Sequence, residues 1–91
     1  MNNEQRMQLI RLRLDIALQP QSLEVIDESH LHRGHEGARD GRGHFRLQIV
    51  SRQFIGKNMV QCHRMVYQAM GELMQSDIHA LAIDAAAPGK P

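Results

Sequence analysis

Five histidines in this chain of 91 residues are placed where folding could bring their imidazoles together. His30, His32 and His35 lie in one glycine-containing segment, His44 follows it, and His79 stands far downstream. Neutral imidazole is the commonest metal ligand in proteins, and it is also the side chain that changes charge near physiological pH. The histidines therefore point to metal or iron–sulfur chemistry, or to proton sensing.

Length and composition limit what kind of protein can carry this chemistry. A chain of 91 residues, 42% of them hydrophobic, has room for one domain with a modest core. Aromatic residues make up only 3%, which leaves little surface for stacking nucleic-acid bases. The 11 basic and 10 acidic residues give a net charge of +1, so there is no strong general attraction to phosphate. Contact with nucleic acid would need a local basic patch.

The compartment is predicted from the cysteine count and from the apolar segments. A single cysteine, Cys62, excludes an internal disulfide, and the first residues are polar rather than secretory in character. No apolar run approaches the ~20 residues that a membrane-spanning helix needs. We therefore expect a cytoplasmic protein with no membrane partner.

The first half of the chain reads as a helix followed by a long-looped hairpin. Apolar residues recur every three or four positions from about 4 to 18, and Pro20 should end this helix. Residues 22–28 and 44–51 alternate between apolar and polar side chains, as half-buried strands do, and we expect them to pair. The polar segment 29–43 between them is long for so small a domain, and such loops are usually functional or disordered.

The second half reads as a helix and a third strand. After a turn at 54–57, Asn58 is a plausible N-cap for a helix from 59 to about 73. Residues 78–83 read as a strand, and 85–91 as a flexible tail. The expected apolar face of the helix, with His63 as a structural histidine on it, consists of Met59, Val60, Val66, Tyr67, Met70 and Leu73.

Four separated blocks together resemble the BolA family. They are LEVIDESH at 23–30, HFR at 44–46, FIGKNMVQCHRMVY at 54–67 and HALA at 79–82, in the family's order. The resemblance spans about residues 10–83 and implies one BolA-like domain, with a core at about 4–84. The implied fold is α+β and resembles a class II KH domain, with a three-stranded mixed sheet and helices packed on one face.

The resemblance implies a non-enzymatic adaptor that pairs with a monothiol glutaredoxin. The two proteins would share a [2Fe-2S] cluster, with thiolates from the glutaredoxin and from glutathione on one side and His79 on the other. The second ligand would come from the loop, with His35 preferred, followed by His32 and His30. Replacing thiolates by imidazoles raises the cluster potential and makes ligation sensitive to pH. Without the resemblance, His79 would read as a strand-end histidine and the loop imidazoles as solvated.

A DNA-binding regulator is the alternative that the KH-like fold and bacterial family members suggest. The Gly-x-x-Gly loop of KH domains is absent, since the turn reads GKNM at 56–59. A small phosphate-contacting patch could still form from Lys57, Arg64, Arg46 and Arg52, beside backbone N–H donors at the start of the helix. No nucleophile–base pair, paired carboxylates, phosphate-binding loop or closed zinc signature indicates an enzyme.

The chain departs from the family pattern at two places. Cys62 stands where the family typically has arginine, and we expect an incidental helical cysteine. Family members commonly continue into a short terminal helix, whereas this chain reads AAAPGKP at 85–91, which puts that helix in doubt. We also expect that two copies of the chain associate as a weak homodimer.

Overall fold

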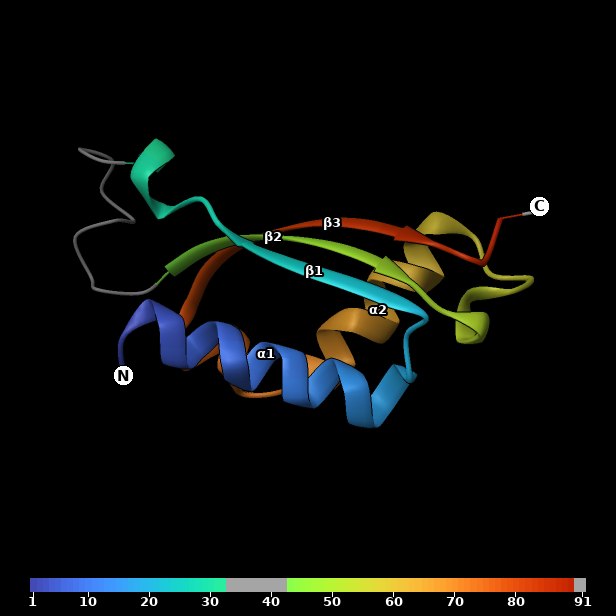
Figure 1. The fold of residues 1–91 in the computed structure, drawn as a ribbon, viewed down its shortest axis with the longest axis horizontal. Coiled ribbons are helices and arrows are strands. Elements are labelled where there is room, and N and C mark those ends of the chain that lie inside the picture. Colours follow the sequence, from blue (N-terminus) through green and yellow to red (C-terminus); the bar gives the residue numbers. More distant parts are fainter. Residues whose placement is uncertain (33–42, 90–91) are drawn as a thin grey trace.

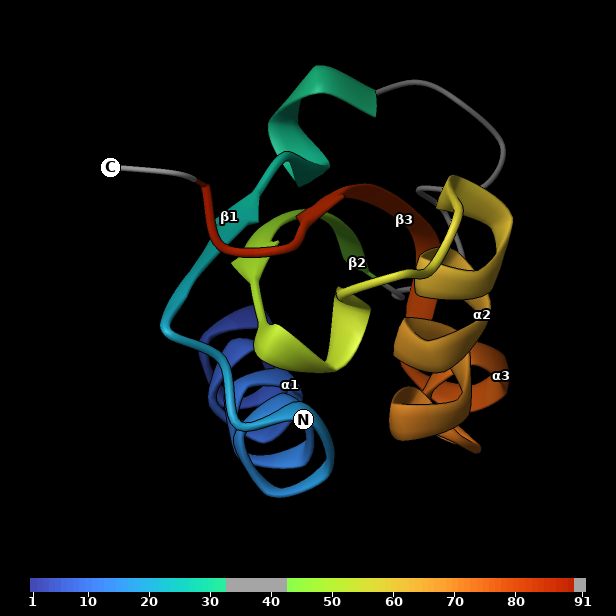
Figure 2. The same ribbon diagram turned by 90° about the vertical axis from the view of Figure 1, so that its right-hand side faces the viewer.

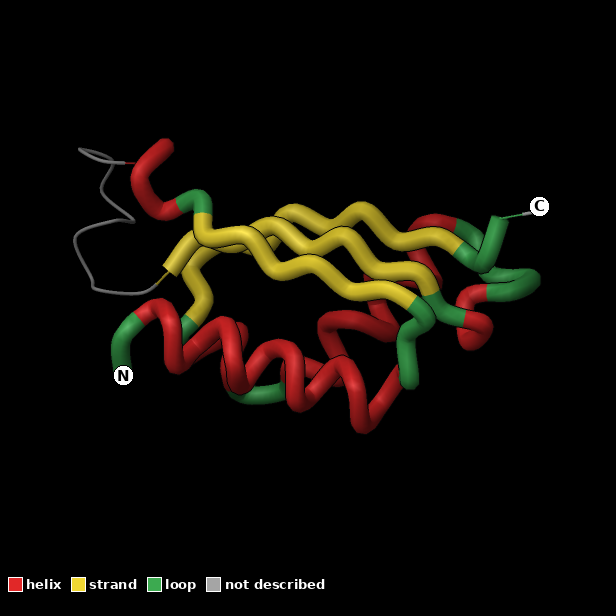
Figure 3. Tube along the Cα trace, viewed as in Figure 1, coloured by secondary structure: helices red, strands yellow, loops and turns green. Residues whose placement is uncertain are grey.

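The computed structural model describes residues 1–32 and 43–89 of the chain, with the side chains of 31 and 32 left out. Within these described ranges, helices and strands follow the predicted order, with two short 3-10 helices and one short α-helix added (Figures 1 and 3). Their bounds are α1 (Asn3–Leu18), β1 (Ser22–Asp27), η1 (Ser29–His32), β2 (Gly43–Val50), η3 (Arg52–Phe54), α2 (Met59–Met70), α3 (Leu73–Ser76) and β3 (Ile78–Ala86).

The three strands form one mixed sheet in the order β1-β2-β3. β1 runs antiparallel to β2, as the predicted hairpin requires, and β2 runs parallel to β3. α1 and α2 lie side by side beneath the same face of the sheet (Figures 1 and 2). The fold is therefore the expected α+β arrangement, in which one face of the sheet is covered by helices and the other is open.

Alternation along the strands decides which side chains enter the core. Val25, Leu47 and Ile83 are neighbours across the three strands and pack against the helices. Residues between these positions point to the open face, because successive side chains of a strand alternate. Among the residues whose burial is described, the buried apolar ones are Ile10, Leu14, Leu18, Val25, Phe45, Leu47, Ile49, Phe54, Cys62, Val66, Met70, Leu73 and Ile78.

The ends of α1 are fixed by side chains. Asn2 and Gln5 form a capping box at its start, in which each side chain accepts a hydrogen bond from the other residue's backbone N–H. At the far end Gln19 takes the left-handed conformation, with φ 45°. The buried hydroxyl of Ser51 donates to the Leu18 carbonyl at 2.6 Å, so one of the last helical carbonyls gains a partner.

α2 starts where the sequence predicts and ends sooner. Asn58 and Gln61 form a second capping box. The helix stops at Met70 because Gly71 adopts a positive φ of 55°, a conformation that favours glycine. Leu73 consequently belongs to the short helix α3, and the prediction of one continuous helix to about 73 is wrong.

The buried face of α2 also differs from the prediction. Cys62, Val66 and Met70, spaced four residues apart, are buried against the core. Val66, Met70 and Leu73 are thus correctly predicted, but the remaining three members of the predicted face are exposed: Met59 (70%), Val60 (64%) and Tyr67 (43%). Cys62 is a buried core residue with a free thiol.

β3 is longer than predicted. It runs to Ala86, so the expectation of a flexible tail is wrong for Ala85 and Ala86, which pair with Ile49 and Val50 of β2. Residues 90–91 lie outside the described residues. No helix in the described part of the chain is long and apolar enough to cross a bilayer.

Candidate functional site

A shift in strand register brings His79 to His44. Gly43 is opposite Ile78, but the next residue, His44, is opposite Ala80, so β3 contains one residue more than β2 at this point. That extra residue is His79. Such a bulge redirects a side chain that regular alternation would send to the other face. The two imidazole rings lie with their centroids 4.9 Å apart and their planes tilted by 52°.

His44 and His79 differ sharply in their exposure to solvent. His44 is only 4% exposed, whereas His79 is exposed. The backbone of His44 is held on both sides, because its N–H donates to Ser29 Oγ at 3.1 Å and its carbonyl accepts from the N–H of Glu28 at 2.8 Å. The exposed ring of His79 therefore lies against the buried ring of His44, whose backbone is held in place.

The loop histidines are placed only in part. His30 lies in η1 and is exposed, next to Asp27. His32 ends η1, and its side chain is not described. His35, the preferred second ligand, lies outside the described residues. η1 ends and β2 begins at the same end of the domain (Figure 1), and His44 is the second residue of β2.

Asp27 anchors the start of η1. Burial raises the pKa of its carboxyl, but the side chain and backbone N–H of Ser29 and the side chain of Asn3 hydrogen-bond to it, and with the attraction of His30 they hold that pKa below its usual range. The N–H of Ser29 donates to Asp27 Oδ1 at 2.9 Å. An ionised Asp27 therefore fixes the residue immediately before His30.

His44 is absent from the ligand set that the sequence predicts. The alternation of apolar and polar residues along this strand places His44 on the open face of the sheet, and this pattern can be seen in the sequence. Its contact with His79 depends on the register shift, which has no local signature. Among the described residues, no group of three or more His, Cys, Asp and Glu side chains is placed to hold a metal ion.

The predicted basic patch is divided between two surfaces. Lys57 and Arg64 line one hollow of about 380 Å³ beside α2. Arg46 lies instead on the open face of the sheet, where its guanidinium donates to Glu28 Oε2 at 3.0 Å and to Asp84 Oδ2 at 3.4 Å. Arg52 is in η3 and is exposed. The structure therefore brings together Lys57 and Arg64, two of the four predicted phosphate-contacting residues, and separates Arg46 from them.

His63 is partly buried, as predicted, but its hydrogen bonding is incomplete. No described residue makes a hydrogen bond with its buried Nε2. The side chain borders an apolar hollow of about 500 Å³ together with Val60, Arg64, Tyr67 and Gln68. The exposed apolar residues of α2 thus surround a histidine that lies outside the His44–His79 site.

Comparisons with known proteins agree with this architecture. The family model described as BolA-like protein matches residues 14–90. The chain is 42% identical to SufE-like protein 1, chloroplastic/mitochondrial, from Arabidopsis thaliana, covering 89% of this chain but 23% of that protein. It is 38% identical to the DNA-binding transcriptional regulator BolA of Escherichia coli, covering 81% of this chain and 68% of the regulator.

A solved structure gives the same result for the fold. The BolA domain of SufE1 from Arabidopsis thaliana superimposes with a TM-score of 0.81 at 42% identity, covering 91% of this chain and 92% of that domain. The mixed sheet, the helix-covered face and the matched sequence blocks lead to one family. This chain belongs to the BolA family.

Proposed function

We propose that this chain is a non-enzymatic adaptor that binds a monothiol glutaredoxin and shares a [2Fe-2S] cluster with it, in iron–sulfur handling or iron-dependent regulation. The observation that carries the proposal is the exposed His79 ring lying 4.9 Å from the ring of the buried His44. His44 is the second residue of β2 and His79 the second residue of β3.

The donor chemistry fits such a cluster. His79 would be one ligand, and a loop histidine, His35 in preference to His32 or His30, would be the second. Thiolates of the glutaredoxin and of glutathione would complete the coordination. A cluster with imidazoles on one iron supplies a one-electron centre of raised potential whose ligation depends on pH. The chain's own part is to present accessible imidazole and to hold it in a fixed direction, which His44 supports by ring contact.

Titration of a [2Fe-2S]-loaded monothiol glutaredoxin with this protein, followed by visible circular dichroism under anaerobic conditions, tests the proposal. We expect a new cluster spectrum that saturates at equal amounts of the two proteins. The His79→Ala variant should leave the glutaredoxin spectrum unchanged. His63→Ala is the matched control, because it removes a histidine on α2, and it should behave as the wild type does. A wild-type protein that fails to alter the spectrum would overturn the adaptor proposal.

The second ligand can be identified in the same titration. His35→Ala, His32→Ala and His30→Ala, made singly, should separate into one variant that loses the mixed cluster and two that retain it. Loss in the His35→Ala variant is the expected result. Retention in all three would exclude a loop histidine as the second ligand.

DNA binding is a second candidate function, favoured by one observation. Lys57 and Arg64 line the same hollow, and no acidic residue occurs between Gly41 and Gly71. The relative from Escherichia coli is described as a DNA-binding regulator. A basic surface on α2 would make sequence-independent contacts with phosphate. Arg46 is outside this surface because it lies on the open face of the sheet, where it is paired with Glu28 and Asp84.

Fluorescence anisotropy with a labelled DNA duplex distinguishes the two candidates. If the basic surface binds DNA, the Lys57→Ala/Arg64→Ala double variant weakens binding and lowers its dependence on salt, while His79→Ala leaves binding unchanged. Arg46→Ala serves as the control for a general change of charge. Equal binding by the double variant and the wild type would exclude this surface.

A further inference from the structure

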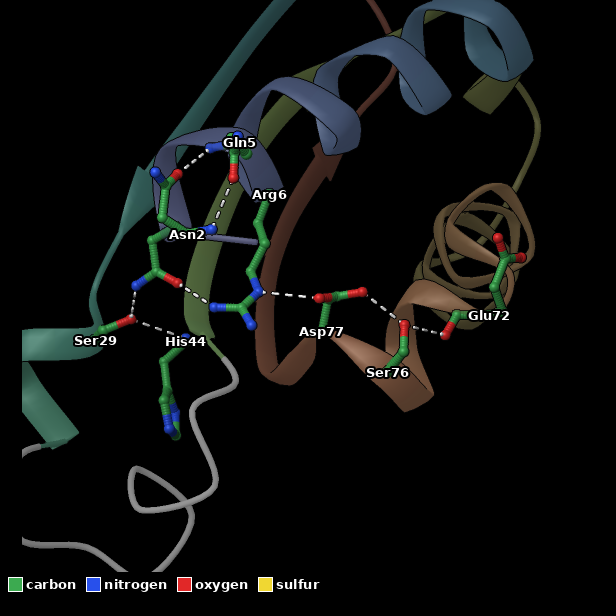
Figure 4. Close-up of polar contacts among 9 residues, drawn as sticks. Asn2, Gln5, Arg6, Ser29, His44, Glu72, Ser76 and Asp77 are labelled. Atoms are coloured by element: carbon green, nitrogen blue, oxygen red, sulfur yellow. Dashed lines mark hydrogen bonds and ion pairs between the residues drawn. The ribbon is translucent and has the colours of Figure 1, made fainter.

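The first turn of α1 reaches across the domain to the residue that precedes β3. Arg6 Nε donates to Asp77 Oδ1 at 3.2 Å, and the two side chains are only 12% and 17% exposed (Figure 4). Ser76 Oγ donates to the other carboxylate oxygen at 2.7 Å. A partly buried, charge-assisted contact of this kind fixes geometry better than an exposed ion pair does.

The same turn also reaches the start of β2. Arg6 Nη1 donates to Asn3 Oδ1 at 2.8 Å, and Asn3 Nδ2 in turn donates to Ser29 Oγ at 3.0 Å and to Asp27 Oδ2 at 3.2 Å. Ser29 Oγ is the atom that accepts the backbone N–H of His44, at 3.1 Å (Figure 4). One chain of hydrogen bonds therefore connects Arg6 to the backbone of His44.

The Arg6–Asp77 contact and the Asn3–Ser29 hydrogen bond reach the two strands on either side of the register shift. The Asp77 carbonyl accepts the N–H of Gly43 at 3.0 Å, immediately before the point where β3 gains its extra residue. His79 follows Asp77 by two positions, and His44 follows Gly43 directly. Arg6 and Asn3 thus tie down both strand starts that carry the paired imidazoles.

We propose that Arg6 and Asn3 are positioning residues for the His44–His79 pair. Arg6 holds the start of β3 through Asp77, and Asn3 holds the start of β2 through Ser29. The printed hydrogen bonds of Arg6 and Asn3 go to Asp77, Ser29 and Asp27 and to each other. Both residues precede residues 14–90, which match the family model. The consequence for cluster ligation rests on the proposed function, but the effect on ring placement does not.

The physical reason lies in the weakness of a strand start at a register shift. Residues at such a shift lose regular ladder hydrogen bonds, so side-chain contacts must specify the direction of His79. Outer residues that orient a metal ligand typically change metal affinity by about 10–100-fold when they are removed. Loss of Arg6 should therefore loosen His79 without unfolding the core, which contains neither Arg6 nor Asn3.

NMR of the full chain without a partner tests the positioning directly. The nuclear Overhauser effect between the ring protons of His44 and His79 should be present in the wild type and lost in Arg6→Met, which keeps most of the apolar stem. Asn3→Ala is a second, milder variant and should weaken the effect. Arg6→Lys, which can still pair with Asp77, should retain part of it.

Arg13→Met is the matched control. Arg13 also lies on α1 and also pairs with a carboxylate beyond α2, that of Glu72, yet it makes no contact with either strand start. We expect Arg13→Met to keep the ring contact. Equal loss in Arg13→Met and Arg6→Met, or retention in both Arg6→Met and Asn3→Ala, would overturn the positioning role.

The same variants, mixed with the loaded glutaredoxin, separate this inference from the proposed function. Arg6→Met should require about tenfold more protein than the wild type for half-maximal change of the cluster spectrum. If the wild type itself gives no change, the adaptor function fails, while the NMR result still decides the positioning role. If Arg6→Met loses the ring contact but forms the cluster as readily as the wild type does, the role in ligation is excluded.

Discussion

His79 contacts His44 because β3 contains one residue more than β2 at the start of the parallel pair. Regular alternation from Leu81 and Ile83, which pack against the core, would send His79 to the helix-covered face. His44 lies one residue before buried Phe45, so it belongs to the opposite face. The register shift is thus the structural cause of the imidazole pair.

Removal of the His44 ring should disturb His79 and leave His63 on α2 unchanged. In His44→Ala, the ring resonances of His79 should shift and broaden, because its packing partner is lost, while those of His63 stay in place. Two-dimensional NMR of the ring C–H groups is the measurement. His44→Phe, which keeps an aromatic ring at this position, should restore a single defined His79 environment. Unchanged His79 resonances in His44→Ala would contradict the supporting role of His44.

Gly43→Ala should destabilise the domain. A Cβ at this position would lie 2.3 Å from two atoms of the Phe45 ring and 3.0 Å from Asn3 Oδ1. Phe45 is 2% exposed, so its ring cannot move aside without disturbing the core. Overpacking of this kind costs about 1–3 kcal/mol in the free energy of unfolding, which urea denaturation measures. Gly89→Ala is the control, because a Cβ there meets nothing within 4 Å.

Shortening a core side chain in the centre of the sheet should lower the free energy of unfolding by more than Gly43→Ala does. Leu47 is fully buried on the middle strand, and Leu47→Ala should lower the free energy of unfolding by about 2–5 kcal/mol. Leu12, on α1, is 53% exposed. Leu12→Ala should change the free energy of unfolding by no more than about 0.5 kcal/mol. Similar losses in these two variants would show that the assignment of the α1 face is wrong.

Glu72 should titrate well below an ordinary glutamate. The hydrogen bond from Arg13, followed by a backbone hydrogen bond and the positive charge of Arg13, lowers the pKa of its carboxyl from 4.5 to about 2. A carboxyl whose pKa is lowered on folding stabilises the folded state above its unfolded pKa, so this contribution is present above pH 4.5 and is lost as the pH falls through about 2. NMR titration of the carboxyl carbon measures this pKa directly.

The matched substitutions for Glu72 lie on α1. Arg13→Met should return the Glu72 midpoint toward 4.5, because both the hydrogen bond and the charge are removed. Arg11→Met removes an exposed positive charge on the same helix, and we expect it to leave the midpoint near that of the wild type. A midpoint for Glu72 that does not respond to Arg13→Met would contradict the contact between α1 and the α2–α3 turn.

Local chemistry explains which elements could be predicted. Strand alternation at 22–28 and 44–51 and the N-cap at Asn58 are signals that neighbouring residues supply, and the structure confirms them within one residue. The end of α2 could not be predicted in the same way, because the sequence does not show which φ a glycine inside a helical pattern will adopt. The face of α2 was misassigned since several apolar residues compete for it, and only packing against the sheet selects Cys62, Val66 and Met70.

The amino-acid pattern alone predicts the order of the major elements, the mixed α+β fold implied by the family blocks, and which histidines are candidate ligands. These follow from periodicity, capping and residue type, which are local properties of the chain. Tertiary packing sets three further relationships: His44 contacts His79, Arg46 is separated from Lys57 and Arg64, and Arg6 reaches Asp77. Each depends on strand register or on helix placement, and both are set by the packing of residues distant in sequence.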